Sequence, residues 1–305
     1  MQKTIEIEVA VIGGATAGLA AALTLGRCMR NAIVFDTGSP RNKPAAHAHN
    51  FFTRDGTPPS ELLRIAREQL VLYPSVQVEQ AAILSAAAEN GRFILQADNG
   101  HTYRAQRVVI ATGVKDDLPA IPGVAELWGS KLFHCPYCHG WEVKDLPVAL
   151  FGSGEMAYEF TRLLYQLNKD LVICTNGPAA FTKEQLQSLA RRHIKVLEEK
   201  VAKVEDAPGG IQITFSDGTV LHKSAAYVKT SLVYHTELAV QLGCELTEQG
   251  SIKVNGLYET SVAGVLAAGD VSGSTPHQVS AAAASGHMAG AMCNNGLAKE
   301  AFEEQ

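Results

Sequence analysis

The sequence lacks any apolar run that approaches the roughly 20 residues of a membrane-spanning helix. It also lacks a basic region followed by an apolar one at its start, where residues 1–9 alternate apolar and charged side chains. Basic residues are not in excess, because 26 lysines and arginines stand against 31 acidic residues. We therefore expect a globular protein of the cytoplasm, with neither a membrane nor a nucleic acid as its partner.

Cysteine is sparse, and only two of the six cysteines stand close together. Two residues separate Cys135 from Cys138, a spacing that one helical turn or a tight turn brings within disulfide distance. The alternative use of the pair is half of a structural zinc site. No second Cys-x-x-Cys is present to complete four ligands, so we expect no metal.

A disulfide formed by this pair could store two electrons, which makes it a candidate redox centre. A redox thiol needs a group that holds or moves its proton, and His139 directly follows the second cysteine. In a reducing cytoplasm, a single pair of this kind is more often catalytic than structural. We predict that Cys135, Cys138 and His139 are the catalytic residues.

The length of 305 residues exceeds the usual size of one domain. We therefore expect two domains of about 100 to 200 residues each. Residues 115–123 are charged and rich in proline, which is typical of a joint between domains. A strand, a glycine turn and a helix follow one another both before and after this joint, so the sequence predicts an α/β fold with two Rossmann-like domains.

The first glycine turn carries a dinucleotide-binding fingerprint. A predicted strand at 5–12 runs into the turn, a helix follows at 19–27, and the next strand, 32–35, ends at Asp36. The acid can accept hydrogen bonds from a ribose, although alanine stands at one position of the turn where glycine is usual. The alternative is a glycine turn that binds nothing. The expected cofactor contacts in the turn are Gly13, Gly14, Ala15, Thr16, Ala17 and Gly18.

Three other stretches of the chain add candidate cofactor contacts. Loop 37–50 leaves the predicted site, and its two histidines are more often surface residues than a metal pair. Strand 108–113 ends in small residues that suit packing against a cofactor. Strand 264–268 leads to an acid that can bind sugar hydroxyls, followed by a helix at about 276–292. The predicted contacts are Arg41, Asn42, His49, Asn50, Ala111, Thr112, Gly113, Gly269 and Asp270.

Between these stretches the pattern predicts scaffold. Residues 58–72 favour a helix with one apolar face. Short strands at 76–78, 91–97 and 102–104 favour a small antiparallel layer.

The second glycine turn, residues 152–157, has an intact GxGxxA pattern within a strand, helix and strand that span 147–174. A helix N-terminus therefore stands where a pyrophosphate could bind. No acid follows the second strand for a ribose, and no arginine cluster follows it for a 2′-phosphate. A scaffold without a ligand and a nicotinamide site both stay open for this unit.

Together these motifs give the chain a resemblance to the low-molecular-weight thioredoxin reductases along essentially its full length. The resemblance implies an FAD-binding domain built from residues 1–115 and 246–305, a nicotinamide-type domain from 116–245, a noncovalent FAD and a homodimer. It also implies that Cys138 faces the flavin and that Cys135 exchanges with the outside thiol. Further flavin contacts implied by the resemblance are Asn50, Gln278 and Val279.

Three departures from that family look like the dithiol oxidases of gliotoxin, holomycin and romidepsin biosynthesis. His139 stands where the reductases carry an acid, the arginine cluster after the second strand is absent, and residues 231–235 replace a Gly-x-x-Pro-Asn turn. This branch implies oxidation of a small-molecule or peptide dithiol to a disulfide, with O2 as acceptor and without NADPH.

Two other hypotheses stay open. The protein could be a disulfide reductase that uses NAD(P)H or another electron donor, or a flavin-bearing sensor of thiol status without turnover.

Overall fold

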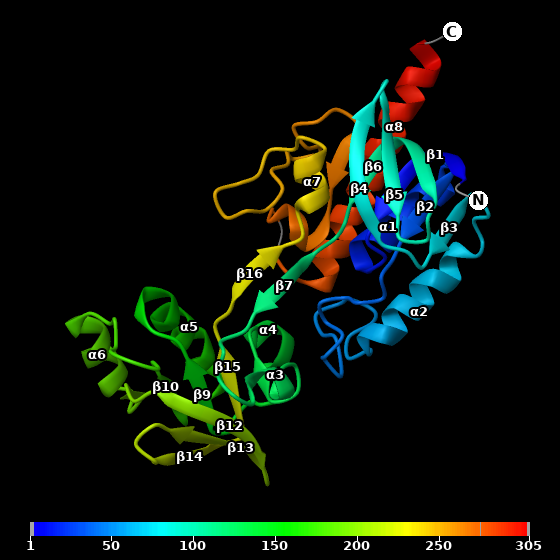
Figure 1. Ribbon diagram of the computed structural model, residues 1–305. Helices are drawn as coiled ribbons and strands as arrows, with labels where there is room; N and C mark the ends of the chain where they lie inside the picture. The colour runs from blue at the N-terminus through cyan, green and yellow to red at the C-terminus, as the bar shows by residue number, and fades with distance from the viewer. Residues whose placement is uncertain (1–2, 275, 304–305) are drawn as a thin grey trace. The chain divides into compact units, whose positions relative to one another are not determined.

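A computed structural model describes residues 3–274 and 276–303 of the chain (Figure 1). The chain forms two compact units. The first contains the described residues up to Lys43, Asn50–Lys115 and the described residues from Leu232 onward, and the second contains Pro44–His49 and Asp116–Ser231. Both units have a parallel β-sheet with helices, so the predicted α/β class with two Rossmann-like units is confirmed.

A seven-stranded sheet organises the first unit in the order β3-β2-β1-β6-β5-β4, with β17 also paired to β6. β1, β2, β3, β6 and β17 run parallel to one another, and β5 is antiparallel to both of its neighbours, β4 and β6. The strands are β1 (Thr4–Ile12), β2 (Ala32–Phe35), β3 (Val76–Glu79), β4 (Ile83–Glu89), β5 (Arg92–Ala97), β6 (Thr102–Ile110) and β17 (Val265–Ala267).

Two sequence predictions for this sheet were wrong, and one strand was missed. Residues 102–104 and 108–113 do not form separate strands, because β6 pairs with β1 along nearly its whole length, from Thr102 to Ile110. β3 is not part of an antiparallel layer, since it pairs with β2 in parallel. β4 was missed because three of its seven residues are alanines, which have low strand propensity.

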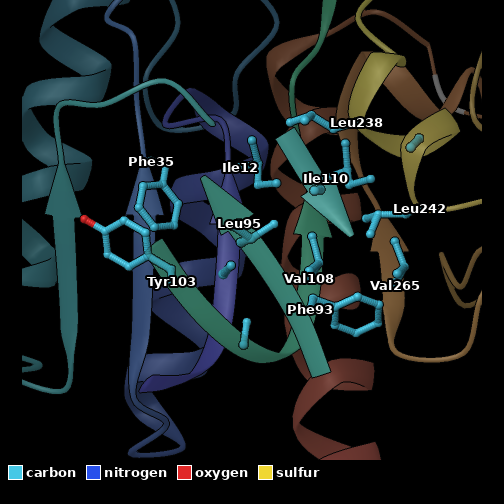
Figure 2. Close-up of a cluster of buried hydrophobic side chains, with 14 of the residues drawn as sticks. Ile12, Phe35, Phe93, Leu95, Tyr103, Val108, Ile110, Leu238, Leu242 and Val265 are labelled. Carbon is cyan, nitrogen blue, oxygen red and sulfur yellow. The ribbon is translucent and has the colours of Figure 1, made fainter. Parts of the chain in front are cut away.

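The core on one face of this sheet is built from strand side chains and from α7 (Glu237–Gln241) (Figure 2). Phe35 and Tyr103 meet edge to face at 4.7 Å between ring centroids. Leu238 and Leu242 bring α7 and the residue after it into the same cluster. Burying each such side chain contributes about 1.5–3 kcal/mol.

The contribution of α7 to this core explains where the second boundary between the units lies. The chain returns to the first unit at Leu232, whereas the sequence placed the return at 246. Leu238, Ala239, Leu242 and Cys244 all pack into the core of the first unit, and no signal in the local sequence distinguishes this packing from a position in the other unit.

The opposite face of the sheet is covered by α1 (Thr16–Arg27), α2 (Pro59–Leu70) and α8 (Val279–Glu303). α8 is longer than the predicted helix, which was expected to end at about 292. Its glycines allow close approach to α1, because a methyl group on Gly286 would overlap the carbonyl oxygen of Ala17. Small residues thus let two helix backbones pack directly against each other.

The second unit has a five-stranded parallel sheet in the order β11-β10-β9-β15-β8 and a three-stranded antiparallel sheet, β12-β13-β14. β7 (Val114–Asp117) and β16 (Ser231–Tyr234) pair with each other where the chain passes between the units. The remaining elements of the second unit are α3 (Val124–Leu127), β8 (Leu132–Phe133), α4 (Pro136–His139), β9 (Val148–Phe151), α5 (Gly154–Leu167), β10 (Leu171–Cys174), α6 (Lys183–Ala190), β11 (Lys195–Leu197), β12 (Val201–Ala207), β13 (Gly210–Phe215), β14 (Val220–Lys223) and β15 (Ala225–Val228). The first unit also contains a 3-10 helix, η1 (Gly269–Ser272).

None of the helices in residues 3–274 and 276–303 combines the length and the apolar character that crossing a membrane would require.

The packing of α8 against α1 predicts opposite effects for two substitutions on one helix. Alanine in place of glycine gains about 1 kcal/mol of helix propensity in a helix interior. Gly296→Ala should show this gain, because its added methyl group would meet only ordinary contacts with Arg107. Gly286→Ala should instead destabilise the protein by about 2 kcal/mol or more, since overpacking forces the helices apart. Urea unfolding of both variants is the measurement, and equal midpoints would contradict this packing.

Candidate active site

The first glycine turn lies between β1 and α1 and is closely packed. Gly13 has a left-handed backbone (φ 112°) and donates a hydrogen bond from its amide to the carbonyl of Phe35 at 2.9 Å. A methyl group on Gly13 would overlap the Ala111 carbonyl oxygen, and one on Gly18 would overlap the Gly13 carbonyl oxygen. Only glycine therefore fits at these two positions. The predicted turn residues and Ala111 are brought together.

The N-terminus of α1 follows this turn. Ala15 is the N-cap residue, and it has no side chain that could cap the helix. The backbone amides of the first turn are therefore available to an anion, which the helix dipole also favours. A pyrophosphate is the group that such a turn binds in dinucleotide sites.

Asp36 lies directly against the glycine turn, because a methyl group on Gly14 would meet the Asp36 side chain. One carboxylate oxygen of Asp36 accepts a hydrogen bond from the Gly38 amide at 2.9 Å, and the other accepts one from the guanidinium of Arg67 on α2. Each carboxylate oxygen has a second lone pair, so ribose hydroxyls can still be bound. The sequence did not predict Arg67, which lies in an ordinary amphipathic helix pattern.

Arg41 and Asp270 form an ion pair in the first unit. Arg41 Nη1 lies 3.2 Å from Asp270 Oδ2, and the two side chains are 15% and 20% exposed. The pair joins the loop after β2 to the end of β17. Gly269 beside it donates its amide hydrogen to Ser285 on α8 at 3.0 Å. Two predicted cofactor contacts from distant parts of the chain therefore lie side by side.

The remaining predicted cofactor contacts of the first unit lie in loops and at the start of α8. Thr112 donates its hydroxyl hydrogen to the carbonyl of His235 at 2.7 Å, and Gly113 has a left-handed backbone with φ 70°. Asn50 also has positive φ and donates its amide hydrogen to Asp55 at 2.8 Å. Asn42 lies in a turn in the loop after β2, and Gln278 and Val279 lie where α8 begins.

The features of the first unit fit FAD. The glycine cradle, the open helix N-terminus and the acid at the end of β2 match the pyrophosphate and the ribose of a dinucleotide. FAD bound here would supply two-electron redox chemistry, which no side chain of this unit can provide.

His49 differs from the other predicted cofactor contacts because it packs with the second unit. Its Nε2 lies 3.3 Å from Oε1 of Glu142, and the two side chains are 21% and 40% exposed. His49 therefore contacts a residue that follows the Cys-x-x-Cys motif closely in the sequence. A contact between His49 and the cofactor stays a prediction.

The redox pair forms a disulfide in the second unit. Cys135 and Cys138 are bonded, with 5.3 Å between their Cα atoms, a separation in the normal range for disulfides. Cys135 is the N-cap of α4 and accepts hydrogen bonds at its carbonyl from the amides of Cys138 and His139. Pro136 occupies the first helical position, where a missing N–H costs nothing. The single turn of helix therefore holds the two sulfurs at bonding distance.

His139 ends this turn and stacks on Phe133, with 4.4 Å between ring centroids and 12° between planes. Both ring nitrogens are buried and have no hydrogen-bond partner in the described part of the chain. Burial lowers the pKa of His139, the Glu142 carboxylate raises it, and His49 lowers it. Because burial is the largest effect, the imidazole is uncharged at neutral pH and can accept a proton.

The other buried thiols are unsuited to redox chemistry. Burial raises the pKa of Cys174 and of Cys293 to about 12, and it also raises the pKa of Cys244. A thiol must ionise to attack, so these three are inert. Within residues 3–274 and 276–303, no group of three histidine, cysteine or acidic side chains could hold a metal ion.

The second glycine turn lies between β9 and α5 and contacts the segment that follows β10. Ser153 accepts a hydrogen bond at Oγ from the amide of Ala180 at 2.8 Å. A methyl group on Gly154 would lie 3.9 Å from the Ala180 Cβ. Glu155, in the first turn of α5, accepts a hydrogen bond from Gln185 at 2.6 Å. The segment after β10 therefore contacts this turn and the first turn of α5, while the N-terminus of α5, like that of α1, has no side-chain cap.

Carboxylates also gather at this edge of the second sheet. A cavity of about 430 Å³ lies beyond β11 and is lined by Glu198, Glu199 and Asp217 together with apolar side chains. Glu198 accepts a hydrogen bond from the amide of Ala179 at 2.8 Å. Negative charge here disfavours a phosphate-bearing ligand.

Comparisons with known proteins identify the family. Residues 7–286 match the family described as pyridine nucleotide-disulphide oxidoreductase. The chain is 33% identical over 278 residues to thioredoxin reductase sirT of Leptosphaeria maculans, covering 85% of each chain. It is 32% identical over 305 residues to thioredoxin reductase tcpT of Claviceps purpurea, covering 95% of this chain and 94% of the other.

Solved structures agree with this match. The crystal structure of HlmI has a TM-score of 0.92 and 33% sequence identity, covering all of this chain and 97% of the other. The putative thioredoxin reductase TrxB from Bacillus anthracis has a TM-score of 0.92 and 31% identity, covering 97% of this chain and 100% of the other. The resemblance stated from the sequence is confirmed, and the chain belongs to the pyridine nucleotide-disulphide oxidoreductases as a thioredoxin reductase-like FAD enzyme.

Proposed function

We propose that this enzyme oxidises a small-molecule or peptide dithiol to an intramolecular disulfide, with O2 as the electron acceptor and without NADPH. The observation that carries the proposal is the pairing of two features in the second unit. A disulfide stands beside an uncharged, buried imidazole, while no arginine cluster that could bind the 2′-phosphate of NADPH follows β10. The site is thus equipped to take protons and electrons from thiols and poorly equipped to bind a nicotinamide.

The first step is an attack on the disulfide. A substrate thiolate attacks the sulfur of Cys135, a new S–S bond forms between them, and the Cys135–Cys138 bond breaks. Cys138 leaves as a thiolate and carries the electron pair of the broken bond.

His139 acts on the proton of this step. A dithiol with an ordinary thiol pKa of about 8.5 is mostly protonated at neutral pH. The uncharged imidazole accepts the thiol proton as the sulfur attacks, and the resulting imidazolium stabilises the nearby thiolate.

The second substrate thiol then attacks the substrate sulfur of the mixed disulfide, and the bond between that sulfur and Cys135 breaks. Cys135 leaves with the electron pair of that bond and takes the proton of the attacking thiol, so that the cyclic product is released and both enzyme cysteines are reduced. FAD bound in the first unit would supply the two-electron acceptance needed to restore the Cys135–Cys138 disulfide, and we propose O2 as the final electron acceptor. We assign FAD binding to the first unit and thiol exchange to the second, and we propose a homodimer located in the cytoplasm.

A second candidate function is disulfide reduction driven by NAD(P)H. Its support is that relatives such as sirT and tcpT are named thioredoxin reductases and that the GxGxxA pattern is intact.

Anaerobic reduction of the flavin separates the two candidates. The oxidised yellow protein is mixed with dithiothreitol in one experiment and with NADPH or NADH in another, and flavin absorbance is followed in a stopped-flow instrument. We expect rapid bleaching by the dithiol and no comparable bleaching by either nicotinamide. Rapid bleaching by a nicotinamide would contradict the proposal and support the reductase. Cys138→Ser should retain FAD but lose dithiol reduction on the order of a thousandfold or more.

The lowered pKa of His139 predicts the pH below which the rate of dithiol oxidation falls. Protonation of the imidazole should slow flavin reduction only below the ordinary histidine pKa of about 6.5, because burial lowers the pKa of His139. His139→Ala should remove this acidic limb and lower the rate at neutral pH by about a hundredfold, the low end for a general base. The measurement is the pH profile of anaerobic reduction. An unchanged profile in the variant would exclude His139 as the base.

A further inference from the structure

α2 carries an arginine to the end of β2. Leu63 and Leu70 of α2 are buried in the same core cluster as residues of β2. Arg67 stands four residues after Leu63 and three before Leu70, so it lies on the same side of the helix. The core packing of α2 therefore brings the Arg67 side chain to Asp36, the residue that directly follows β2.

The Asp36 carboxylate is held by donors from two different parts of the chain. The guanidinium of Arg67 donates a hydrogen bond to Oδ2, and the Gly38 amide donates one to Oδ1 at 2.9 Å. The two side chains of the ion pair, Arg67 and Asp36, are 41% and 15% exposed. A donor on each oxygen defines the orientation of the carboxylate, which leaves the remaining lone pairs to accept hydrogen bonds from ribose hydroxyls.

The charge of Asp36 lies close to the first glycine turn. A methyl group on Gly14 would lie 2.8 Å from Asp36 Oδ2, the oxygen that Arg67 contacts. The same turn leads to the uncapped N-terminus of α1, which suits an anionic pyrophosphate. A carboxylate beside a bound anion repels it, and a cation paired with that carboxylate offsets the repulsion.

Arg64, one turn earlier on α2, is used differently. Its guanidinium forms ion pairs with Glu61 and Glu68 of the same helix, and its side chain is 54% exposed. These pairs connect residues of α2 to one another and do not reach the glycine turn. Two arginines of one helix thus differ in a way that an experiment can use.

We propose that Arg67 is a positioning residue for FAD. Its guanidinium holds the Asp36 carboxylate in the orientation that accepts the ribose hydroxyls, and it offsets the negative charge of that carboxylate beside the pyrophosphate. The inference concerns the affinity for the cofactor, so it does not depend on which thiol the enzyme oxidises or on the electron acceptor.

The test measures the dissociation constant of FAD. The FAD-loaded protein is diluted in steps, and released flavin is quantified by its fluorescence. Arg67→Ala should weaken FAD binding by about tenfold to a hundredfold, because it removes a hydrogen bond between charged groups. Arg67→Lys should recover part of this loss, since it keeps the positive charge without the guanidinium geometry. Arg64→Ala is the matched control on the same helix and should leave the dissociation constant unchanged.

A double-mutant cycle with Asp36→Asn separates positioning from a general loosening of α2. If Arg67 acts through Asp36, Arg67→Ala should lose most of its effect on FAD binding in the Asp36→Asn background. If it acts by supporting the fold of α2, the loss should be the same in both backgrounds. Thermal unfolding at saturating FAD shows whether each variant is folded, and Arg67→Gln replaces Arg67→Ala in both backgrounds if the alanine variant is not.

Three results would overturn the inference. The first is an equal loss of affinity in the two backgrounds. The second is unchanged or tighter FAD binding in Arg67→Ala, which would mean that the arginine competes with the ribose for the carboxylate. The third is unchanged FAD binding in Asp36→Asn, which would mean that the acid does not contact the cofactor.

Discussion

The burial of an uncharged imidazole beside the disulfide is the interaction on which the chemistry of this protein depends. His139 is fixed at the end of a single helical turn and lies flat on Phe133, so its ring nitrogens are removed from water. This placement favours the form of histidine that accepts protons. An acid at the same position would be charged at neutral pH and would instead disfavour a thiolate nearby. The identity of this one residue therefore bears directly on whether thiols can be deprotonated here.

The two glycine turns of the chain show how the same local sequence acquires different uses. In the first unit the turn is backed by Asp36, and the first turn of α1 has no side-chain cap. In the second unit Ser153 accepts a hydrogen bond from the amide of Ala180, and no acid and no arginine cluster follows β10 directly. A glycine pattern fixes backbone geometry, but the residues that follow the second strand decide which ligand can be held there.

Much of the fold could be predicted because local signals and tertiary structure agree. The order strand, glycine turn, helix and strand up to Asp36 was read correctly, since buried strands and small residues at a turn have few alternatives. β4 was missed because its alanines carry no strand signal and only pairing with β5 determines their conformation. The positions of α7 and of Pro44–His49 depend on packing between distant segments.

The candidate site could likewise be predicted only where its residues are neighbours in the sequence. Cys135, Cys138 and His139 are adjacent in the sequence, so their proximity needed no tertiary information. The contact between His49 and Glu142 could not be read in that way, because the two residues are far apart in the sequence and meet only in the folded chain. A histidine in a polar loop gives no sign of its partner. Arg67 was missed for a similar reason, since an arginine on an amphipathic helix is usually solvent-exposed.

The most direct test of the account is the stoichiometry of aerobic turnover in the absence of any nicotinamide. The purified flavoprotein is supplied with a dithiol in an oxygen electrode, and product disulfide is quantified in the same sample. We predict continuous oxygen uptake, with one O2 consumed for each disulfide formed and no change when NADPH is added. No oxygen uptake from the dithiol, together with consumption of NADPH when a disulfide is supplied, would contradict it.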